Sequence, residues 1–146
     1  MHRHSWSQQP PEEFGLQLEK WVCDEIAPVL AHLDGAPLLI GKSLGTLAAA
    51  LAAEQYLPAV WLTPLLTVPW AVAALERAGS PFLLVGGTAD SAWDSAIARR
   101  LTPHVLEIDN ADHGMYVPGP LTDSIAVLAR VTVAVEEFLD TISWPS

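Results

Sequence analysis

Cysteine and basic residues are both scarce in this chain. Among 146 residues there is one cysteine, Cys23, which leaves no partner for an internal disulfide and no second thiol for a metal site. Seven Lys and Arg residues stand against 17 Asp and Glu residues, giving a formal net charge of -10. Such a charge repels phosphate backbones and anionic lipid surfaces. We therefore expect no nucleic-acid or membrane partner, and the lone cysteine favours the reducing cytoplasm.

Long hydrophobic segments without breaks are also lacking. Residues 56–75 carry no charge over about the length that a bilayer helix requires, but Pro58, Pro64 and Pro69 interrupt them. Each proline removes a backbone donor and disfavours helix in the preceding residue. This segment is predicted to be a buried strand, a loop and a following helix. The first 14 residues contain no apolar stretch typical of a signal peptide, which again favours a cytoplasmic location.

Hydrophobic residues make up 51% of the chain, which is enough for one core. We therefore predict a single domain over residues 1–146. Helical patterns alternate with short apolar runs that show no polar alternation. Such runs are typical of parallel strands covered on both faces. The prediction is an α/β three-layer sandwich with a mostly parallel sheet. Its expected strands are 37–40, 59–62, 82–85 and 105–108, and its expected helices are 14–33, 44–55, 71–78, 91–101 and 121–142.

One serine lies between two glycines where a strand meets a helix. Gly41-Lys42-Ser43-Leu44-Gly45 matches the G-x-S-x-G nucleophile elbow, in which a strained turn exposes the serine hydroxyl. We expect side chains at both glycine positions to strike the neighbouring strand and helix. A glycine-rich turn with a helix-capping serine is the simpler alternative. A phosphate-binding loop is disfavoured, because the glycine that should precede the lysine at the required spacing is absent.

A carboxylate and a histidine follow at the ends of later strands. Asp90 comes a short loop after the 82–85 strand, and His113 comes a short loop after the 105–108 strand. In a parallel sheet these loops meet at the carboxyl edge, together with Ser43. Asp112 is the alternative acid, although adjacent side chains usually point apart. The order Ser, Asp, His is that of the α/β-hydrolase triad.

These three segments carry a family resemblance. "LLIGKSLG", "LLVGGTAD" and "IDNADHGM" resemble the nucleophile elbow, acid loop and histidine loop of the α/β-hydrolase fold superfamily, particularly small serine hydrolases of the dienelactone-hydrolase-like group. The resemblance implies Ser43 as nucleophile, Asp90 as acid, His113 as base and the Leu44 N–H as an oxyanion donor. It implies hydrolysis of small carboxylic esters or thioesters through an acyl-enzyme on Ser43, with no metal or organic cofactor.

Other residues have secondary roles in this interpretation. Asp94 is expected to be a solvated helix residue, Cys23 a small buried hydrophobe, and the histidines outside the motifs surface or structural groups. Apolar side chains near the strand ends are candidates for a substrate pocket. These are Leu65, Trp93 and Met115, together with Trp61, Trp70 and Tyr116.

The chain reaches its elbow strand early, at residue 37, whereas enzymes of this fold usually have strands and an oxyanion loop before it. The expectation is a minimal or truncated α/β-hydrolase fold whose reading frame extends upstream. Its exposed sheet edge invites a homo-oligomer, and one oxyanion donor alone makes a slow enzyme. The rival hypothesis is a catalytically weak or inactive fold member that binds a ligand or partner.

Overall fold

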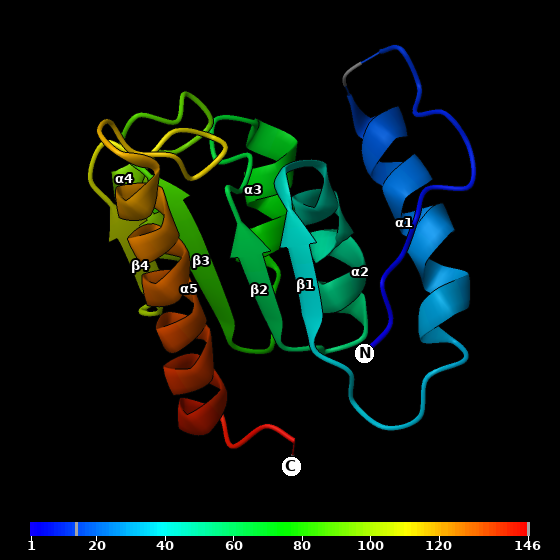
Figure 1. Cartoon of the computed structure of the whole chain (residues 1–146). Helices are drawn as coiled ribbons and strands as arrows, with labels where there is room; N and C mark the ends of the chain where they lie inside the picture. The colour runs from blue at the N-terminus through cyan, green and yellow to red at the C-terminus, as the bar shows by residue number, and fades with distance from the viewer. Residues whose placement is uncertain (14, 146) are drawn as a thin grey trace.

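A computed structural model describes residues 1–13 and 15–145, which include a sheet of four parallel strands (Figure 1). The strands lie side by side in sequence order, so each connection returns the chain to the same end of the sheet. The predicted α/β class and parallel sheet are confirmed. The strands are β1 (Leu39–Lys42), β2 (Ala59–Leu62), β3 (Phe82–Gly87) and β4 (Val105–Ile108).

Helices cover both faces of the sheet, as a three-layer arrangement requires (Figure 1). A short 3-10 helix, η1 (Ser43–Ala48), continues into α2 (Ala49–Glu54) and lies on one face with α3 (Pro69–Glu76) and α4 (Ser95–Leu101). The long α5 (Leu121–Thr141) lies on the other face, against β3 and β4. At the β1 end of the molecule, α1 (Leu16–Leu30) packs on η1 and α2.

The alternation of side chains along the strands separates the hydrophobic residues into clusters on the two faces of the sheet. Trp61 and Leu84 point into the larger core beneath η1, α2 and α3, whereas Val60 and Val85 point toward Phe138 of α5. All of these side chains are buried, which explains why the strands show no polar alternation in the sequence.

The edge strand β1 differs from the others. Among the described residues it pairs with β2 alone, and its residues alternate between half-buried and exposed. Ile40 is 59% exposed on this strand. Because α5 lies over the far strands, no helix of the described residues covers the same face at β1 (Figure 1).

Element boundaries differ from the sequence predictions for identifiable reasons. The 44–55 helix begins one residue earlier, as the 3-10 helix η1, and becomes α-helical only at Ala49. The 71–78 helix begins at Pro69, whose fixed φ suits a first helical position. The 91–101 helix begins at Ser95, because the Asp94 carboxylate caps it by accepting the Ile97 N–H at 2.8 Å. Phe14, the predicted start of the first helix, lies outside the described residues.

The uncharged segment 56–75 forms β2, a loop and the start of α3. Across the residues that the structure describes, no helix has both the length and the apolarity to cross a membrane.

Candidate active site

Ser43 stands at a sharp turn between β1 and η1. Its φ is +51°, in the left-handed region that residues with a side chain rarely adopt. Such strain persists only where the surrounding structure over-determines it, and it concentrates at functional sites. The turn leaves the Ser43 side chain at the carboxyl end of the sheet, where the loops after β3 and β4 also lie.

The two glycines of the elbow have different roles. A Cβ at Gly41 would lie 2.7 Å from the backbone oxygen of Gly45 and 2.7 Å from Cζ3 of Trp61. A Cβ at Gly45 would meet nothing within 4 Å. The steric requirement expected at both positions is therefore present at Gly41 and wrong at Gly45, because Gly45 faces open space beside η1.

Asp90 is the buried end of the acid loop that follows β3. Its side chain is 2% exposed, and both carboxylate oxygens have partners. Oδ1 accepts the Ala92 N–H at 2.9 Å, which fixes the orientation of the group. Oδ2 lies 2.8 Å from Nδ1 of His113.

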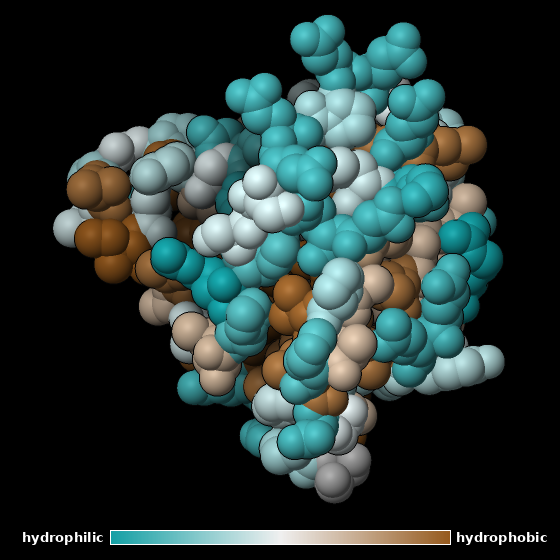
Figure 2. Space-filling view, turned by 90° about the vertical axis from the view of Figure 1, so that its right-hand side faces the viewer, coloured by the Kyte–Doolittle hydropathy of each residue, from teal (hydrophilic) through white to brown (hydrophobic). Residues whose placement is uncertain are grey.

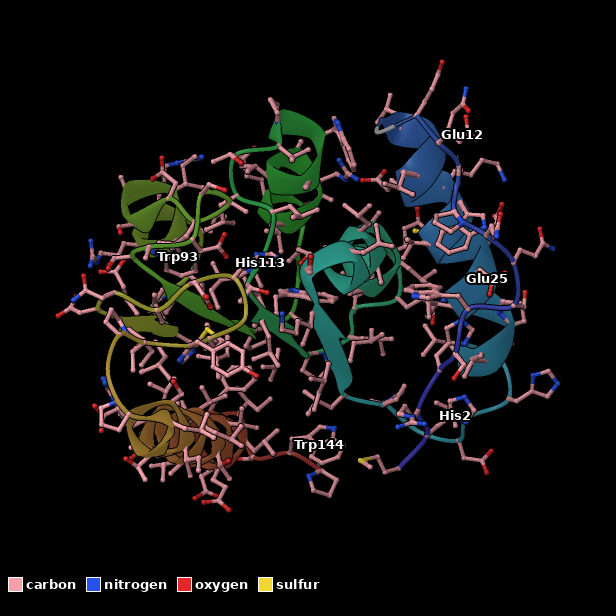
Figure 3. All side chains as sticks on the ribbon, turned by 45° about the horizontal axis from the view of Figure 1, so that its top comes forward. His2, Glu12, Glu25, Trp93, His113 and Trp144 are labelled. Carbon is pink, nitrogen blue, oxygen red and sulfur yellow. The ribbon has the colours of Figure 1, made fainter. Side chains whose placement is uncertain are left out.

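His113 joins the acid to the serine. Its Nε2 lies 2.7 Å from Ser43 Oγ, at the opposite side of the ring from the contact with Asp90. With the proton on Nδ1, the imidazole donates to Asp90 and accepts from the serine hydroxyl. The His113 side chain, labelled in Figure 3, is 42% exposed, so solvent reaches the imidazole. The structure thus brings together three residues that lie far apart in the sequence.

The acid and histidine loops are held against each other by backbone contacts. Ala89 N–H donates to the Ala111 oxygen at 3.0 Å, and Asn110 N–H donates to Thr88 Oγ1 at 2.8 Å. Gly87 allows this approach, since a Cβ there would lie 2.2 Å from the Ala111 oxygen. The 2.8 Å contact between Asp90 and His113 follows from this loop packing.

Lys42 helps to hold the candidate site together, a role that the sequence did not predict. Its Nζ donates to the backbone oxygen of His113 at 2.9 Å, which ties the histidine loop to the strand that carries Ser43. The two residues are 71 positions apart, and no local pattern in the sequence indicates that they meet.

Asp112, the alternative acid, is engaged within its own loop. Its Oδ1 accepts the N–H groups of Gly114 at 2.8 Å and Tyr116 at 3.0 Å. The Asp112 N–H donates in turn to the Tyr116 oxygen at 2.9 Å. Asp112 therefore shapes the loop after His113, while Asp90 faces the imidazole. Asp94, expected as a solvated helix residue, is the cap of α4.

The residues expected to bind substrate are divided between two sides of the sheet. Trp93 is buried against Gly86, near α4, and its Nε1 donates to Glu107 at 2.7 Å (Figure 3). Hydrogen bonds from Ser95 and then Trp93 lower the pKa of Glu107, which keeps this anchor ionised. Leu65 packs against the larger core. Leu44 follows Ser43 in the first turn of η1.

Met115 lies on the α5 side instead. It helps to line a groove of about 380 Å³ between the sheet, the loop after His113 and α5. Leu65 and Trp93 do not line this groove, so they and Met115 do not form one pocket wall there.

Other nucleophiles and bases lie elsewhere. Burial, reinforced by nearby Glu19, raises the pKa of the Cys23 thiol to about 11, so it is protonated near neutral pH. His4 pairs with Glu25 at 3.3 Å, and His104 packs edge-on against Phe138. Within residues 1–13 and 15–145, no group of three His, Cys, Asp or Glu side chains is arranged to hold a metal ion.

The arrangement can move a proton. A serine hydroxyl within hydrogen-bond reach of an imidazole, which in turn contacts a buried carboxylate, has the parts needed to raise serine nucleophilicity. Stabilising an oxyanion beside Ser43 requires hydrogen-bond donors in addition to this proton transfer. The first N–H groups of η1 are donors that have no partner within the helix.

Comparison with models of protein families gives no match, and comparison with curated protein sequences gives none. Among solved structures, the chain is similar to the esterase Est1E from Butyrivibrio proteoclasticus, with a TM-score of 0.56 and 14% sequence identity. The match covers 82% of this chain and 71% of that chain. At this identity the likeness concerns the fold alone.

Proposed function

We propose that the protein is a serine hydrolase that cleaves small carboxylic esters or thioesters through an acyl-enzyme on Ser43. The observation that carries this proposal is the series of two short contacts, 2.7 Å from Ser43 Oγ to His113 Nε2 and 2.8 Å from His113 Nδ1 to Asp90 Oδ2. The shared fold with an esterase supports a hydrolase at a coarser level. The three sequence motifs favour the dienelactone-hydrolase-like group within it.

In the acylation half, Ser43 Oγ attacks the carbonyl carbon of the substrate while its proton passes to His113 Nε2. Asp90 holds the imidazole in the required tautomer and stabilises its cation. The Leu44 N–H supplies one hydrogen bond to the tetrahedral oxyanion. The imidazolium then protonates the departing alkoxide or thiolate, and the acyl group remains on Ser43.

In the deacylation half, a water molecule replaces the alcohol or thiol. His113 Nε2 takes a proton from the water as its oxygen attacks the acyl carbon. Collapse of the second tetrahedral intermediate returns the proton to Ser43 Oγ and releases the carboxylic acid. Exposure of the imidazole gives water access to this step.

The second candidate function is an interaction protein, and β1 is the observation that favours it. Within the part of the chain that the structure describes, this edge strand carries a row of backbone groups with no neighbouring strand on one side, and Ile40 beside them is 59% exposed. Such an edge is a template for pairing with another chain, including a second copy. On this alternative the serine is unreactive and the sheet edge is the functional surface.

Two acid variants test the proposed enzyme against this alternative. Asp90→Asn should lower the turnover of p-nitrophenyl acetate by about 10⁴-fold, because the amide favours the wrong imidazole tautomer. Asp112→Asn, the matched control, should retain most of the turnover, since the Asn oxygen can still accept the loop N–H groups. Steady-state hydrolysis and circular dichroism of both variants provide the measurement.

The opposite pattern, with turnover lost in Asp112→Asn and kept in Asp90→Asn, would identify Asp112 as the acid. A folded wild-type chain without hydrolysis would favour the interaction protein.

A further inference from the structure

An apolar groove opens on the α5 side of the sheet, next to the uncovered part of β1. Its volume is about 380 Å³, within the range of small-molecule sites. Figure 2 shows hydrophobic residues gathered at the margin of the molecule on the α5 side, with a hollow between them and the rest of that face. The lining residues used below are Lys42, Leu62, Met115, Tyr116, Ile125 and Leu128.

The groove lies next to the candidate active site, although Ser43 and His113 themselves do not line it. Lys42 immediately precedes Ser43, and Gly114 immediately follows His113, and both residues line the groove. The hydrogen bond from Lys42 Nζ to the His113 oxygen crosses between these two walls. The groove therefore begins one residue away from both Ser43 and His113.

The wall formed by the histidine loop is rigidly built. The Asp112 carboxylate accepts the N–H groups of Gly114 and Tyr116. The backbone oxygen of Asp112 accepts the Met115 N–H at 2.9 Å. Met115 has a φ of +67°, held by this turn. The side chains of Met115 and Tyr116 are thus placed over the groove before any ligand binds, which reduces the ordering cost of binding.

The side chains that line the groove favour an uncharged hydrocarbon chain as the ligand. Lys42 is the one charged residue in the lining, and its ammonium group already donates to His113. The α5 wall is aliphatic, with Ile125 58% and Leu128 65% exposed to solvent. Covering these side chains with a hydrocarbon chain is favourable, whereas a polar or charged group would find few partners.

We propose that this groove binds the acyl chain of the substrate, which makes the enzyme selective for esters or thioesters of medium-length straight-chain acids over acetyl esters. The proposal rests on the proposed hydrolase function and specifies its substrate class. The chain occupies the space between Leu62 and Met115 on one side and Leu128 on the other. The carbonyl carbon lies at Ser43 Oγ.

The test compares p-nitrophenyl acetate with p-nitrophenyl octanoate. Each methylene that enters the groove should raise kcat/KM by about three- to fourfold, and the octanoyl chain has six methylenes more than the acetyl group, so the octanoate should be preferred by roughly 10³. Leu128→Trp, which fills the groove from an exposed position, should reduce this preference at least about tenfold. Ile125→Trp provides a second position if the first variant folds poorly.

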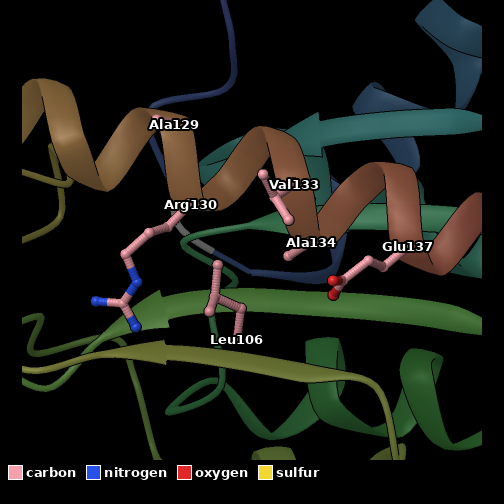
Figure 4. A pocket seen from close by; sticks show the side chains of 6 residues that line it. All are labelled: Leu106, Ala129, Arg130, Val133, Ala134 and Glu137. Atoms are coloured by element: carbon pink, nitrogen blue, oxygen red, sulfur yellow. The ribbon is translucent and has the colours of Figure 1, made fainter.

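Val133→Trp is the matched control. Val133 lies on the same helix and is 50% exposed, but it lines a separate hollow with Leu106 and Arg130 (Figure 4). The chain-length preference of this variant should equal that of the wild type. An effect of the same size in both variants would indicate a general disturbance of α5 and would overturn the assignment of the groove.

A binding measurement separates this proposal from the proposed function. Ser43→Ala protein should bind octanamide more tightly than acetamide in calorimetry, and Leu128→Trp should remove the difference, whether or not the wild type hydrolyses esters. Equal binding of the two amides would overturn the groove assignment even if p-nitrophenyl acetate is hydrolysed. So would a dimer in sedimentation that Leu128→Trp dissociates, since a second copy would then fill the groove.

Discussion

Replacing Ser43, His113 or Asp90 with alanine should lower ester turnover by about 10³ to 10⁶ in each case. The reason is that the 2.7 Å and 2.8 Å contacts make one proton-transfer unit, and each replacement disables the same step. Combining two replacements should therefore lower turnover little further than the stronger single replacement does. The measurement is kcat/KM for p-nitrophenyl acetate in single and double variants.

The controls are residues of the same types outside the unit. Ser91, Asp109 and His2 are exposed, and their replacement by alanine should leave turnover near the wild-type value. Losses that multiply in the double variants would show that the three side chains act independently, contrary to the geometry.

Gly41→Ala should damage both folding and turnover. The new methyl group would lie 2.7 Å from the Gly45 backbone oxygen and from Trp61, so η1 or the buried indole must shift. Overpacking of this kind costs about 1–3 kcal/mol in the free energy of unfolding. Because Ser43 is two residues away, a displacement of its hydroxyl by about 1 Å would lower turnover by roughly 10².

The paired variant is Gly45→Ala, which adds the same methyl group where nothing lies within 4 Å. Its stability and turnover should stay close to those of the wild type. Urea unfolding and kcat/KM for both variants check the prediction. Equal damage in the two variants would mean that the crowding at Gly41 does not shape the elbow.

The fold was predictable because its central strands, β2 and β3, are buried on both faces. Residues 59–62 and 82–85 are apolar runs that turn signals bound, and they coincide with β2 and most of β3, while the pattern at 105–108, which includes Glu107, coincides with β4. The order Ser43, Asp90, His113 could also be read from the sequence, because parallel strands put successive loops at one edge. That these side chains meet at hydrogen-bond distance required the structure.

Other parts of the site depend on contacts that leave no local pattern. The Lys42 bond to the His113 oxygen joins residues 71 positions apart. The different surroundings of Gly41 and Gly45 depend on the position of Trp61, which comes from β2. Trp93 was expected beside the substrate, but Gly86 leaves room for its ring in the core. The groove requires α5 and β1 to be placed relative to each other, which periodicity alone does not give.

The central claim is that Ser43 is an activated nucleophile, and labelling with a fluorophosphonate probe tests it without knowledge of the substrate. The account predicts that the probe modifies the folded wild-type chain at Ser43, located by mass spectrometry of peptides, and that His113→Ala and Ser43→Ala abolish the adduct. A folded chain that stays unlabelled, or an adduct on another residue, would contradict the account.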